Sequence, residues 1–303
     1  MMDVLVLELD EDYLSGESLA AKLGVSRVAV HKRIKKLRQE GYPVESGPLG
    51  YRFAPGAPAP RPLARRYRGG MLTNALYLGK VDSTQNVIRK LASAGAPEGS
   101  LVVAEAQDAG RGRRGRQWLS PSGGLYFSLL LRPQHPIAAL PLVSLAAGAA
   151  LARATGVGGL KWPNDLLDPD GRKLAGVLTE AELLGEEVRY LILGVGLNFE
   201  PPSLDTAAGL DEFGRQERVE VLSQFLAAFE NLYMALPDAA TVLEAWTEHD
   251  YTIGREVNIS TPAGAARGVA AALESDGSLL IINARGKKHR VSAGEVELIG
   301  GFA

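Results

Sequence analysis

Cysteine is absent from this chain of 303 residues. That absence excludes disulfide bonds, a thiol nucleophile and zinc held by thiolates, and it fits a reducing compartment. Histidine is scarce as well, because the chain has only four, far apart in the sequence: His31, His135, His249 and His289. Since no two of them have the spacing of a ligand pair, we expect no metal cage built from side chains.

Long hydrophobic runs are also missing. The most apolar stretch, 140–154, is shorter than a membrane span and contains Arg153 near its end. The start of the chain is acidic between Glu8 and Asp12, whereas a signal peptide begins with basic residues. We therefore expect a soluble cytoplasmic protein with no membrane contact.

Charge of one sign does not dominate either, because the formal net charge is −2. Binding to nucleic acid would then need a local cluster of basic residues rather than the whole surface. The hydrophobic share of 46% is typical of a globular protein with a core, and the length suits two or three domains.

The sequence changes character twice. A run rich in proline, alanine and glycine covers 54–62, and its prolines favour extended backbone and oppose a helix. From about Thr252, short strand-like segments alternate with turn signals, as in a small β-barrel. We predict an α+β protein with an N-terminal domain over 1–54, a linker over 55–62, a central domain of mixed β-sheet and helices over 63–251, and a C-terminal domain over 252–303.

The first fifty residues predict a winged helix-turn-helix. A short amphipathic helix over 15–23 is followed by a tight turn, and Ser26 can cap a second helix that runs to about Glu40. Strand-like segments over 43–46 and 51–53 flank another turn and would form the wing. In this fold the second helix enters the major groove of DNA.

The second helix has an apolar face and a basic face. Val30, Ile34 and Leu37 share one face and should pack inward. No acid lies among the six cations of this helix, which are Arg27, Lys32, Arg33, Lys35, Lys36 and Arg38. The alternative is an ordinary solvated face, but such faces normally mix acids with bases. We predict DNA binding through Ser26, Arg27, Lys32, Lys35 and Lys36.

Two polar motifs of the central region follow predicted strands. The strand 75–78 leads to Ser83 and Thr84, which cap the next helix or point hydroxyl groups at a ligand, and the two roles are compatible. The strand 101–105 leads to a loop over 107–116 in which glycines separate four arginines. Glycine allows close approach to an anion and arginine offers forked donors, so phosphate binding is one interpretation. A disordered basic loop or a second nucleic-acid contact is the other.

A turn over 168–171 joins two further strand-like segments. That hairpin should bring Asp165 close to Lys173, although a lone lysine in a strand is usually a surface residue. A third apolar strand ends at Asn198, at the kind of strand end where ligands gather in open sheets. The three polar side chains are therefore candidates for one site.

Five segments, in this order, resemble the motifs of biotin–protein ligases. They are Ser83-Thr84, the Gly/Arg run at 110–116, Lys161-Trp-Pro-Asn-Asp165, Arg172-Lys-Leu-Ala-Gly176 and Gly194-Val-Gly-Leu-Asn198. Through 26–32 and 50–51, the N-terminal domain resembles the helix-turn-helix of the bifunctional bacterial type, the biotin operon repressor. The tail resembles the small SH3-like β-barrel at the C-terminus of that family.

The resemblance implies an ATP-dependent ligase. Biotin and ATP would form biotinoyl-5'-AMP, and biotin would then pass to a lysine of a biotin carboxyl carrier protein, such as that of acetyl-CoA carboxylase. Magnesium would accompany ATP. Lys173, Arg113 and Asp165 would act in catalysis, with Asp165 facing the incoming lysine. The residues implied in binding biotin or the adenylate are Ser83, Thr84, Gln85, Gln107, Gly110, Arg111, Gly112, Arg113, Arg116, Trp118, Lys173, Gly176, Gly194, Gly196 and Asn198.

The resemblance also implies that the adenylate promotes homodimers on operator DNA, where the protein would repress biotin genes. Three features depart from the family. The turn over 168–171 is one residue longer than usual, which would shift Lys173 relative to Asp165. Gln85 stands where asparagine is common, and Phe213 is the aromatic offered in place of a tryptophan that covers adenine in some members.

Three alternatives remain open. A lipoate–protein ligase would have a Ser-Gly-Gly-Gly-like loop in place of the Arg/Gly run. A transcription factor that only senses biotin would not need the Arg/Gly loop, Asp165 and Lys173 together. A ligase whose N-terminal domain regulates nothing would have the same sequence features as a true repressor.

Overall fold

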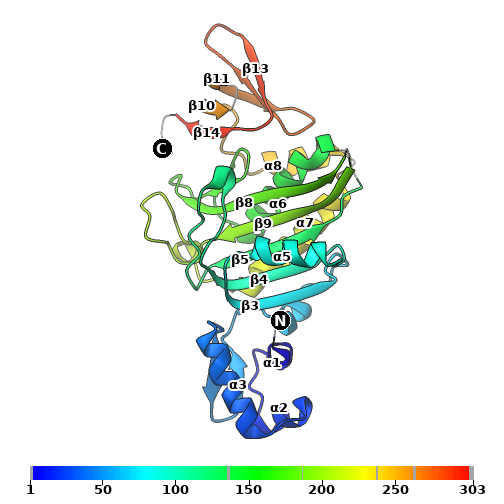
Figure 1. Cartoon of the computed structure of the whole chain (residues 1–303). Coiled ribbons are helices and arrows are strands. Elements are labelled where there is room, and N and C mark those ends of the chain that lie inside the picture. The colour runs from blue at the N-terminus through cyan, green and yellow to red at the C-terminus, as the bar shows by residue number, and fades with distance from the viewer. Residues whose placement is uncertain (1–2, 135–136, 186, 237, 262–263, 300–303) are drawn as a thin grey trace.

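The fold is that of a computed structural model, which describes residues 3–134, 137–185, 187–236, 238–261 and 264–299. Three units follow one another along the long axis of the molecule, with the first helices at one end and the last strands at the other (Figure 1). Helices and strands are both abundant, so the α+β prediction is confirmed. His135 and parts of the predicted C-terminal domain, 262–263 and 300–303, lie outside the described residues.

The N-terminal unit, over its described residues, consists of helices and one hairpin. Its elements are α1 (Val4–Glu8), α2 (Gly16–Leu23), α3 (Arg27–Gln39), β1 (Val44–Gly47) and β2 (Gly50–Phe53). Ser26 caps α3 as predicted, because its Oγ accepts a hydrogen bond from the backbone N–H of Ala29 at 3.2 Å. Val30, Ile34 and Leu37 are buried, also as predicted. The prediction missed α1, because five residues show too little periodicity.

The predicted linker contains a helix, so the expectation of extended backbone throughout it was wrong. α4 spans Pro60–Arg66, with prolines in its first turn. The first backbone N–H groups of a helix have no acceptor within the helix, so proline there removes no hydrogen bond. The effect of proline depends on its position in a helix, and the prediction neglected that dependence.

A seven-stranded sheet forms the central unit, in the order β3-β4-β5-β9-β8-β7-β6. The strands are β3 (Asn74–Val81), β4 (Ser100–Gln107), β5 (Leu125–Leu131), β6 (Gly159–Lys161), β7 (Asp165–Leu167), β8 (Lys173–Leu184) and β9 (Glu187–Leu197). The β3–β4 pair is parallel and the other pairs are antiparallel. β5 is buried along its whole length because helices cover both faces of the sheet.

The helices on the two faces differ in number. α5 (Thr84–Ser93) covers one face, where Ile88 and Ala92 pack against Val102 and Ile192. The other face carries α6 (Leu140–Thr155), α7 (Arg218–Met234) and α8 (Ala239–Thr247) (Figure 1). The long apolar run is thus α6, a helix buried between the sheet and two other helices. No helix in the described ranges is both long and apolar enough to cross a membrane.

Contacts with the edge strand β3 hold the N-terminal unit against the central one. The carbonyl of Glu40 accepts a hydrogen bond from the backbone N–H of Lys80 at 2.9 Å. Gly79 permits this approach, since a Cβ there would lie 1.9 Å from the Glu40 carbonyl oxygen. Tyr42 donates to the carbonyl of Tyr77 at 3.1 Å, and their rings meet edge to face.

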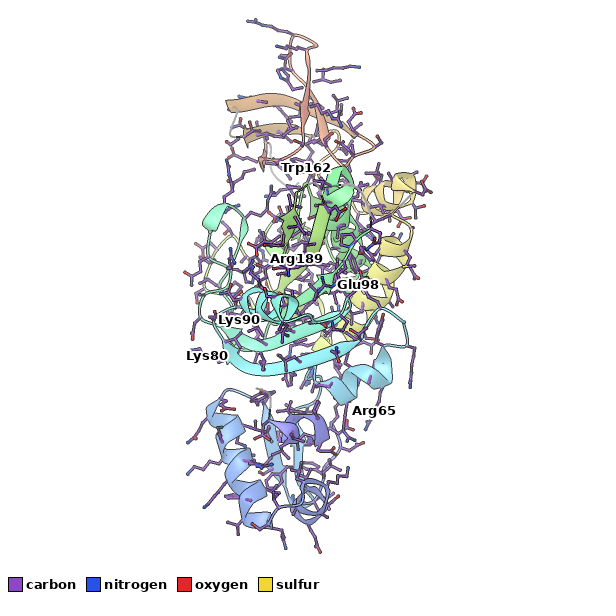
Figure 2. The ribbon with its side chains drawn as sticks, turned by 45° about the vertical axis from the view of Figure 1, so that its right-hand side comes forward. Arg65, Lys80, Lys90, Glu98, Trp162 and Arg189 are labelled. Atoms are coloured by element: carbon purple, nitrogen blue, oxygen red, sulfur yellow. The ribbon has the colours of Figure 1, made fainter. Side chains whose placement is uncertain are left out.

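Arginines of α4 add ion pairs at the same junction. Arg65, which Figure 2 labels on the helix between the two units, pairs with the buried carboxylate of Asp10. Arg66 pairs with Glu11 at 2.9 Å and with Glu217 at 3.2 Å, so it joins the N-terminal segment to the start of α7. The two units are therefore connected by packing, hydrogen bonds and charge.

The C-terminal unit is an antiparallel sheet in the order β13-β12-β11-β10-β14. Its strands are β10 (Glu256–Thr261), β11 (Gly264–Leu273), β12 (Leu279–Ile282), β13 (Lys288–Val291) and β14 (Glu295–Leu298). β13 and β14 are its edges, and no pairing between described residues closes the sheet into a barrel. Trp162 joins this unit to the central one, because its indole N–H donates to the carbonyl of Gly277 at 3.0 Å. Figure 2 shows Trp162 at that boundary.

Candidate active site

A cavity of about 280 Å³ lies beside the start of α5 and over β8 and β9. Fourteen of the residues predicted to bind substrate line it, and these are Ser83, Thr84, Gln85, Gln107, Arg111, Gly112, Arg113, Arg116, Trp118, Lys173, Gly176, Gly194, Gly196 and Asn198. Gly110 is the exception: a Cβ there would lie 2.4 Å from the Trp118 carbonyl oxygen, so this glycine allows the base of the loop to close. Segments far apart in sequence thus meet around one hollow.

A hydrogen-bond network fixes the polar end of the cavity. Gln107, at the end of β4, accepts from the backbone N–H of Thr84 at 2.8 Å and donates to Ser120 at 2.8 Å. The hydroxyl of Ser128 donates to the Thr84 hydroxyl at 2.8 Å. Ser83 caps α5 and also lines the cavity, so one hydroxyl can serve as helix cap and face a ligand. These side chains are preorganised before any ligand binds.

Gln85 leaves one buried acceptor without a partner. Its amide nitrogen donates to the Leu178 carbonyl at 3.1 Å, which fixes the orientation of the amide. The other end, Oε1, is buried and has no hydrogen bond to any described residue. Gly194 makes room for this side chain, because a Cβ there would lie 2.6 Å from Gln85 Nε2. An unpaired buried acceptor costs about 1–3 kcal/mol, so a ligand donor at this point would recover stability.

Trp118 has a buried hydrogen-bond donor that also lacks a partner among the described residues. Its indole nitrogen is buried and unpaired within the described part of the chain. The ring lies over Gly196, where a Cβ would be 2.4 Å from Nε1, so only glycine leaves the ring its place. The cation of Lys173 lies 5.3 Å from the centre of this ring, at cation–π distance.

The Arg/Gly loop is ordered by contacts with three different elements. It makes a short 3-10 turn over Arg113–Gly115. Arg113 donates to the side-chain oxygen of Asn164 at 2.9 Å, and burial lowers the pKa of its guanidinium. Arg111 pairs with Glu180 at 2.9 Å. Arg116 lines the cavity, but its guanidinium pairs with Glu295 of β14.

Asp165 and Lys173 meet as the hairpin predicts. Lys173 Nζ lies 2.6 Å from Asp165 Oδ1, and Lys161 Nζ lies 3.2 Å from Oδ2 of the same carboxylate. Burial opposes ionisation of Asp165, but the two ammonium groups outweigh it and hold the pKa of this carboxyl below its ordinary value. A fixed carboxylate therefore stands between two cations.

A second cavity, of about 250 Å³, lies next to the first. Both are lined by Arg113, Arg116, Asn164, Lys173 and Thr206. Asp165 lines the second cavity and not the first, and Gly294 and Glu295 bring the C-terminal unit to its wall. The carboxylate thus reaches the site from a side different from that of the Ser83–Gln107 network.

Several lining residues were missed by sequence reasoning. Phe127, Val177 and Val195 are apolar and look like ordinary core residues of strands. Pro202, Leu204, Thr206 and Ala207 come from the segment after β9, which carries no recognisable motif. Phe213, the aromatic suggested as an adenine cover, lines none of the cavities at this site.

Side-chain oxygens of the kind that magnesium prefers are present at Asn198 and at the acidic residues. Asn198 is buried and donates to the carbonyl of Lys173 at 3.3 Å, so its amide is partly used within the protein. Among the described residues, no group of three histidine, cysteine, aspartate or glutamate side chains is placed to hold a metal ion. The residues present therefore do not form a magnesium cage of their own.

Three segments of the chain match known protein families. Residues 78–198 match the biotin/lipoate A/B protein ligase family, residues 4–52 match an HTH domain, and residues 252–299 match the biotin protein ligase C terminal domain. The cavity is lined largely by residues of the first segment.

Relatives extend the similarity to almost the whole chain. The bifunctional ligase/repressor BirA of Bacillus subtilis (strain 168) is 34% identical, covering 95% of this chain and 94% of the relative. That of Escherichia coli (strain K12) is 31% identical, covering 92% and 91%. The solved biotin protein ligase from Aquifex aeolicus in complex with biotin and ATP is 32% identical, has a TM-score of 0.61 and covers 75% of this chain and 99% of its own.

Proposed function

Because this chain belongs to the family of biotin protein ligases, in its bifunctional ligase/repressor form, we propose that the two adjoining cavities are where biotin is activated and transferred. The protein is an ATP-dependent biotin–protein ligase, with biotin and ATP as substrates. The contact that carries the site assignment is the Lys173–Asp165 pair of 2.6 Å, at the junction of the two cavities.

In the first step, an oxygen of the biotin carboxylate attacks the α-phosphorus of ATP and pyrophosphate leaves. Two anions must approach each other, so fixed positive charge at the point of attack lowers the barrier. Lys173 and Arg113 supply that charge, and Asp165 and Asn164 hold them in position. Magnesium would arrive bound to ATP, since the described side chains offer it no cage.

The ureido ring of biotin suits the polar end of the first cavity. A ureido group presents two N–H donors and one carbonyl acceptor. Gln85 Oε1 is a buried acceptor in need of a donor, whereas Ser83 and Gln107 can donate to the carbonyl. Gln85 would thus replace the asparagine common at this position with a longer amide. Gln85→Met should raise the KM for biotin about tenfold and change kcat little. An unchanged KM would remove Gln85 from the biotin site.

In the second step, a lysine amine of the carrier attacks the acyl carbon of the adenylate, AMP leaves, and the amine loses a proton. Asp165 lines the second cavity, which gives the amine a route to the adenylate apart from the biotin pocket. Its carboxylate, kept ionised by Lys161 and Lys173, accepts a hydrogen bond from the amine and orients it for attack, and the amine proton passes to water. The carrier is a biotin carboxyl carrier protein, such as that of acetyl-CoA carboxylase.

Enzymatic assays separate this function from its nearest rival. Purified protein with ATP, magnesium and biotin should exchange radiolabelled pyrophosphate into ATP and label a carrier lysine. Lipoate in place of biotin should give neither signal. Activity with lipoate and none with biotin would identify a lipoate–protein ligase instead.

The N-terminal domain acts as a repressor of biotin genes, and its operator contacts are proposed for Ser26, Arg27, Lys32, Lys35 and Lys36. Ser26 supports this role by capping α3, and the other four side chains are exposed. One domain covers only a half-site, so we expect a homodimer, formed when the adenylate is bound. The C-terminal sheet would belong to an SH3-like barrel, and the protein would act in the cytoplasm, where carrier and operator are found.

We propose the domain limits that the sequence predicts, except that the linker ends at 59 because α4 begins at Pro60.

Gel shifts with DNA upstream of biotin genes test the regulatory role. Binding should require biotin and ATP together, and sedimentation should show a dimer under the same conditions. Equal binding without both substrates would contradict the dependence on the adenylate.

A further inference from the structure

The exposed face of α3 carries one apolar side chain among its cations. Val28 is 65% exposed, although valine is far more often buried than exposed in folded proteins. Its neighbours on that face are His31, Lys32 and Lys35, which are exposed as well. The spacing of three, four and seven residues puts all four on one side of the helix. The core positions lie on the opposite side, so the fold does not require an apolar residue at 28.

The position of Val28 along α3 matters as much as its exposure. It is the second residue of the helix, two positions after the Ser26 cap. In helix-turn-helix proteins the first residues of the recognition helix contact base edges, while other parts contact the phosphates. The far end of α3 is held against the central sheet through Glu40 and Lys80, so the first turn points away from that unit (Figure 1).

Charge decides what kind of surface can cover Val28. The face around it is cationic, and no acid of the described residues pairs with Arg27, Lys32 or Lys35. A polyanion therefore fits this face better than an apolar protein surface does. Within the major groove, the one apolar group on a base edge is the C5 methyl of thymine.

We propose that Val28 is a specificity-determining residue that reads the methyl group of one thymine in each operator half-site. This inference rests on the proposed DNA-binding role of α3. His31 lies on the same face, and its Nδ1 is 3.2 Å from the hydroxyl of Tyr51 in β2, which connects this face of the helix to the wing. Lys32 and Lys35 hold the helix on the phosphates.

The first experiment is a selection from a randomised duplex pool by the full-length protein with biotin, ATP and magnesium. The wild type should enrich one invariant thymine in each half-site. Val28→Ala should bind the pool but lose the preference at that position alone. Val4→Ala is the matched control, since Val4 is 57% exposed in the same domain and lies outside α3. It should enrich the same sequence as the wild type.

The second experiment removes only the methyl group. In the selected duplex, deoxyuridine replaces the invariant thymidine, which leaves base pairing and hydrogen-bonding edges unchanged. Binding by the wild type should weaken about fourfold for each half-site, the size expected for one methyl group taken out of contact. Binding by Val28→Ala should not change, because the two γ-methyl groups that would contact the thymine methyl are already removed in this variant.

Each other outcome overturns the inference. A thymine preference that survives in Val28→Ala would assign the reading to another residue. Tight and sequence-selective binding without any invariant thymine would overturn the role of Val28 and leave the proposed repressor function standing. Failure of the wild type to bind DNA in the presence of both substrates would overturn both.

Discussion

The cations of the catalytic cavity and the cations of α3 are arranged in opposite ways. In the cavity each charge is held by a partner: Lys173 by Asp165 at 2.6 Å, and Arg111 by Glu180 at 2.9 Å. On α3, Lys32 and Lys35 are exposed and have no ion pair to a described residue, and Lys36 forms an exposed pair with Glu40 at 3.5 Å. Catalysis needs charge at a fixed point, because the gain comes only where charge develops in the transition state. Binding to a polyanion needs charge of the right sign over an area.

That difference predicts how each region responds to the loss of one cation. A variant in the cavity should lose a step of the reaction. A variant on α3 should lose a share of the affinity. The expected losses decrease from Lys173 in the cavity to Lys35 on α3.

Lys173→Ala should have the largest effect. It removes the charge that meets carboxylate and phosphate, and adenylate formation should fall about a thousandfold, at the upper end for the loss of one electrostatic contact. Pyrophosphate exchange measures this step. Lys80→Ala is the matched control, because Lys80 forms an exposed pair with Asp108 at 2.7 Å outside the cavity. Equal losses in both variants would show that position in the cavity does not matter.

Asp165→Asn should act mainly on the second step. The neutral amide holds the incoming amine more weakly than the carboxylate does, so transfer from preformed biotinoyl-5'-AMP to the carrier should slow about a hundredfold. Single-turnover labelling with the adenylate measures transfer without the first step. A loss confined to pyrophosphate exchange, with normal transfer, would restrict Asp165 to the positioning of Lys173.

Arg113→Gly should weaken retention of the adenylate. Loss of a half-buried guanidinium at the phosphate should shorten the lifetime of bound biotinoyl-5'-AMP about tenfold and increase labelling of unrelated lysines. Arg285→Gly serves as control, because Arg285 is exposed in the turn between β12 and β13 and lines neither cavity. Leakage that is equal in the two variants would deny Arg113 a specific role.

Lys35→Ala should have the smallest effect, about threefold in operator affinity at moderate salt. The loss should be the same for every DNA sequence, and the slope of log affinity against log salt should fall by about one. Titrations at several salt concentrations measure both quantities. A loss limited to one base position would show that Lys35 reads a base and does not act only as a charge over the phosphates.

Local patterns predicted most of the fold and placed the motifs correctly on it. Ser26 capped the predicted helix, and the turn before Lys173 brought it to Asp165, because both depend on residues close in sequence. The prediction of extended backbone was wrong at Pro60, because proline is tolerated in the first turn of a helix although it breaks the interior. The closed barrel was expected from strand signals and from the family resemblance, and neither says how the edge strands of this chain meet.

The site was predictable only where chemistry is visible in the residue type. Arginine, lysine and serine in the motifs drew attention, whereas Phe127 and Val195 resemble core residues until the sheet is assembled. Some features depend on contacts between residues far apart in sequence, and no local pattern predicts them. Examples are the unpaired oxygen of Gln85 and the ion pair of Arg116 with Glu295.

The contact of Glu40 with Lys80 has a consequence for solubility. β3 is an edge strand of the central sheet, and an exposed edge offers free N–H and carbonyl groups to the edge of another molecule. The N-terminal domain occupies part of that edge, with Glu40 bound to the Lys80 N–H and Tyr42 bound to the Tyr77 carbonyl. The DNA-binding domain thus also protects the edge strand β3. A ligase without this domain would expose that edge and would be more prone to aggregate.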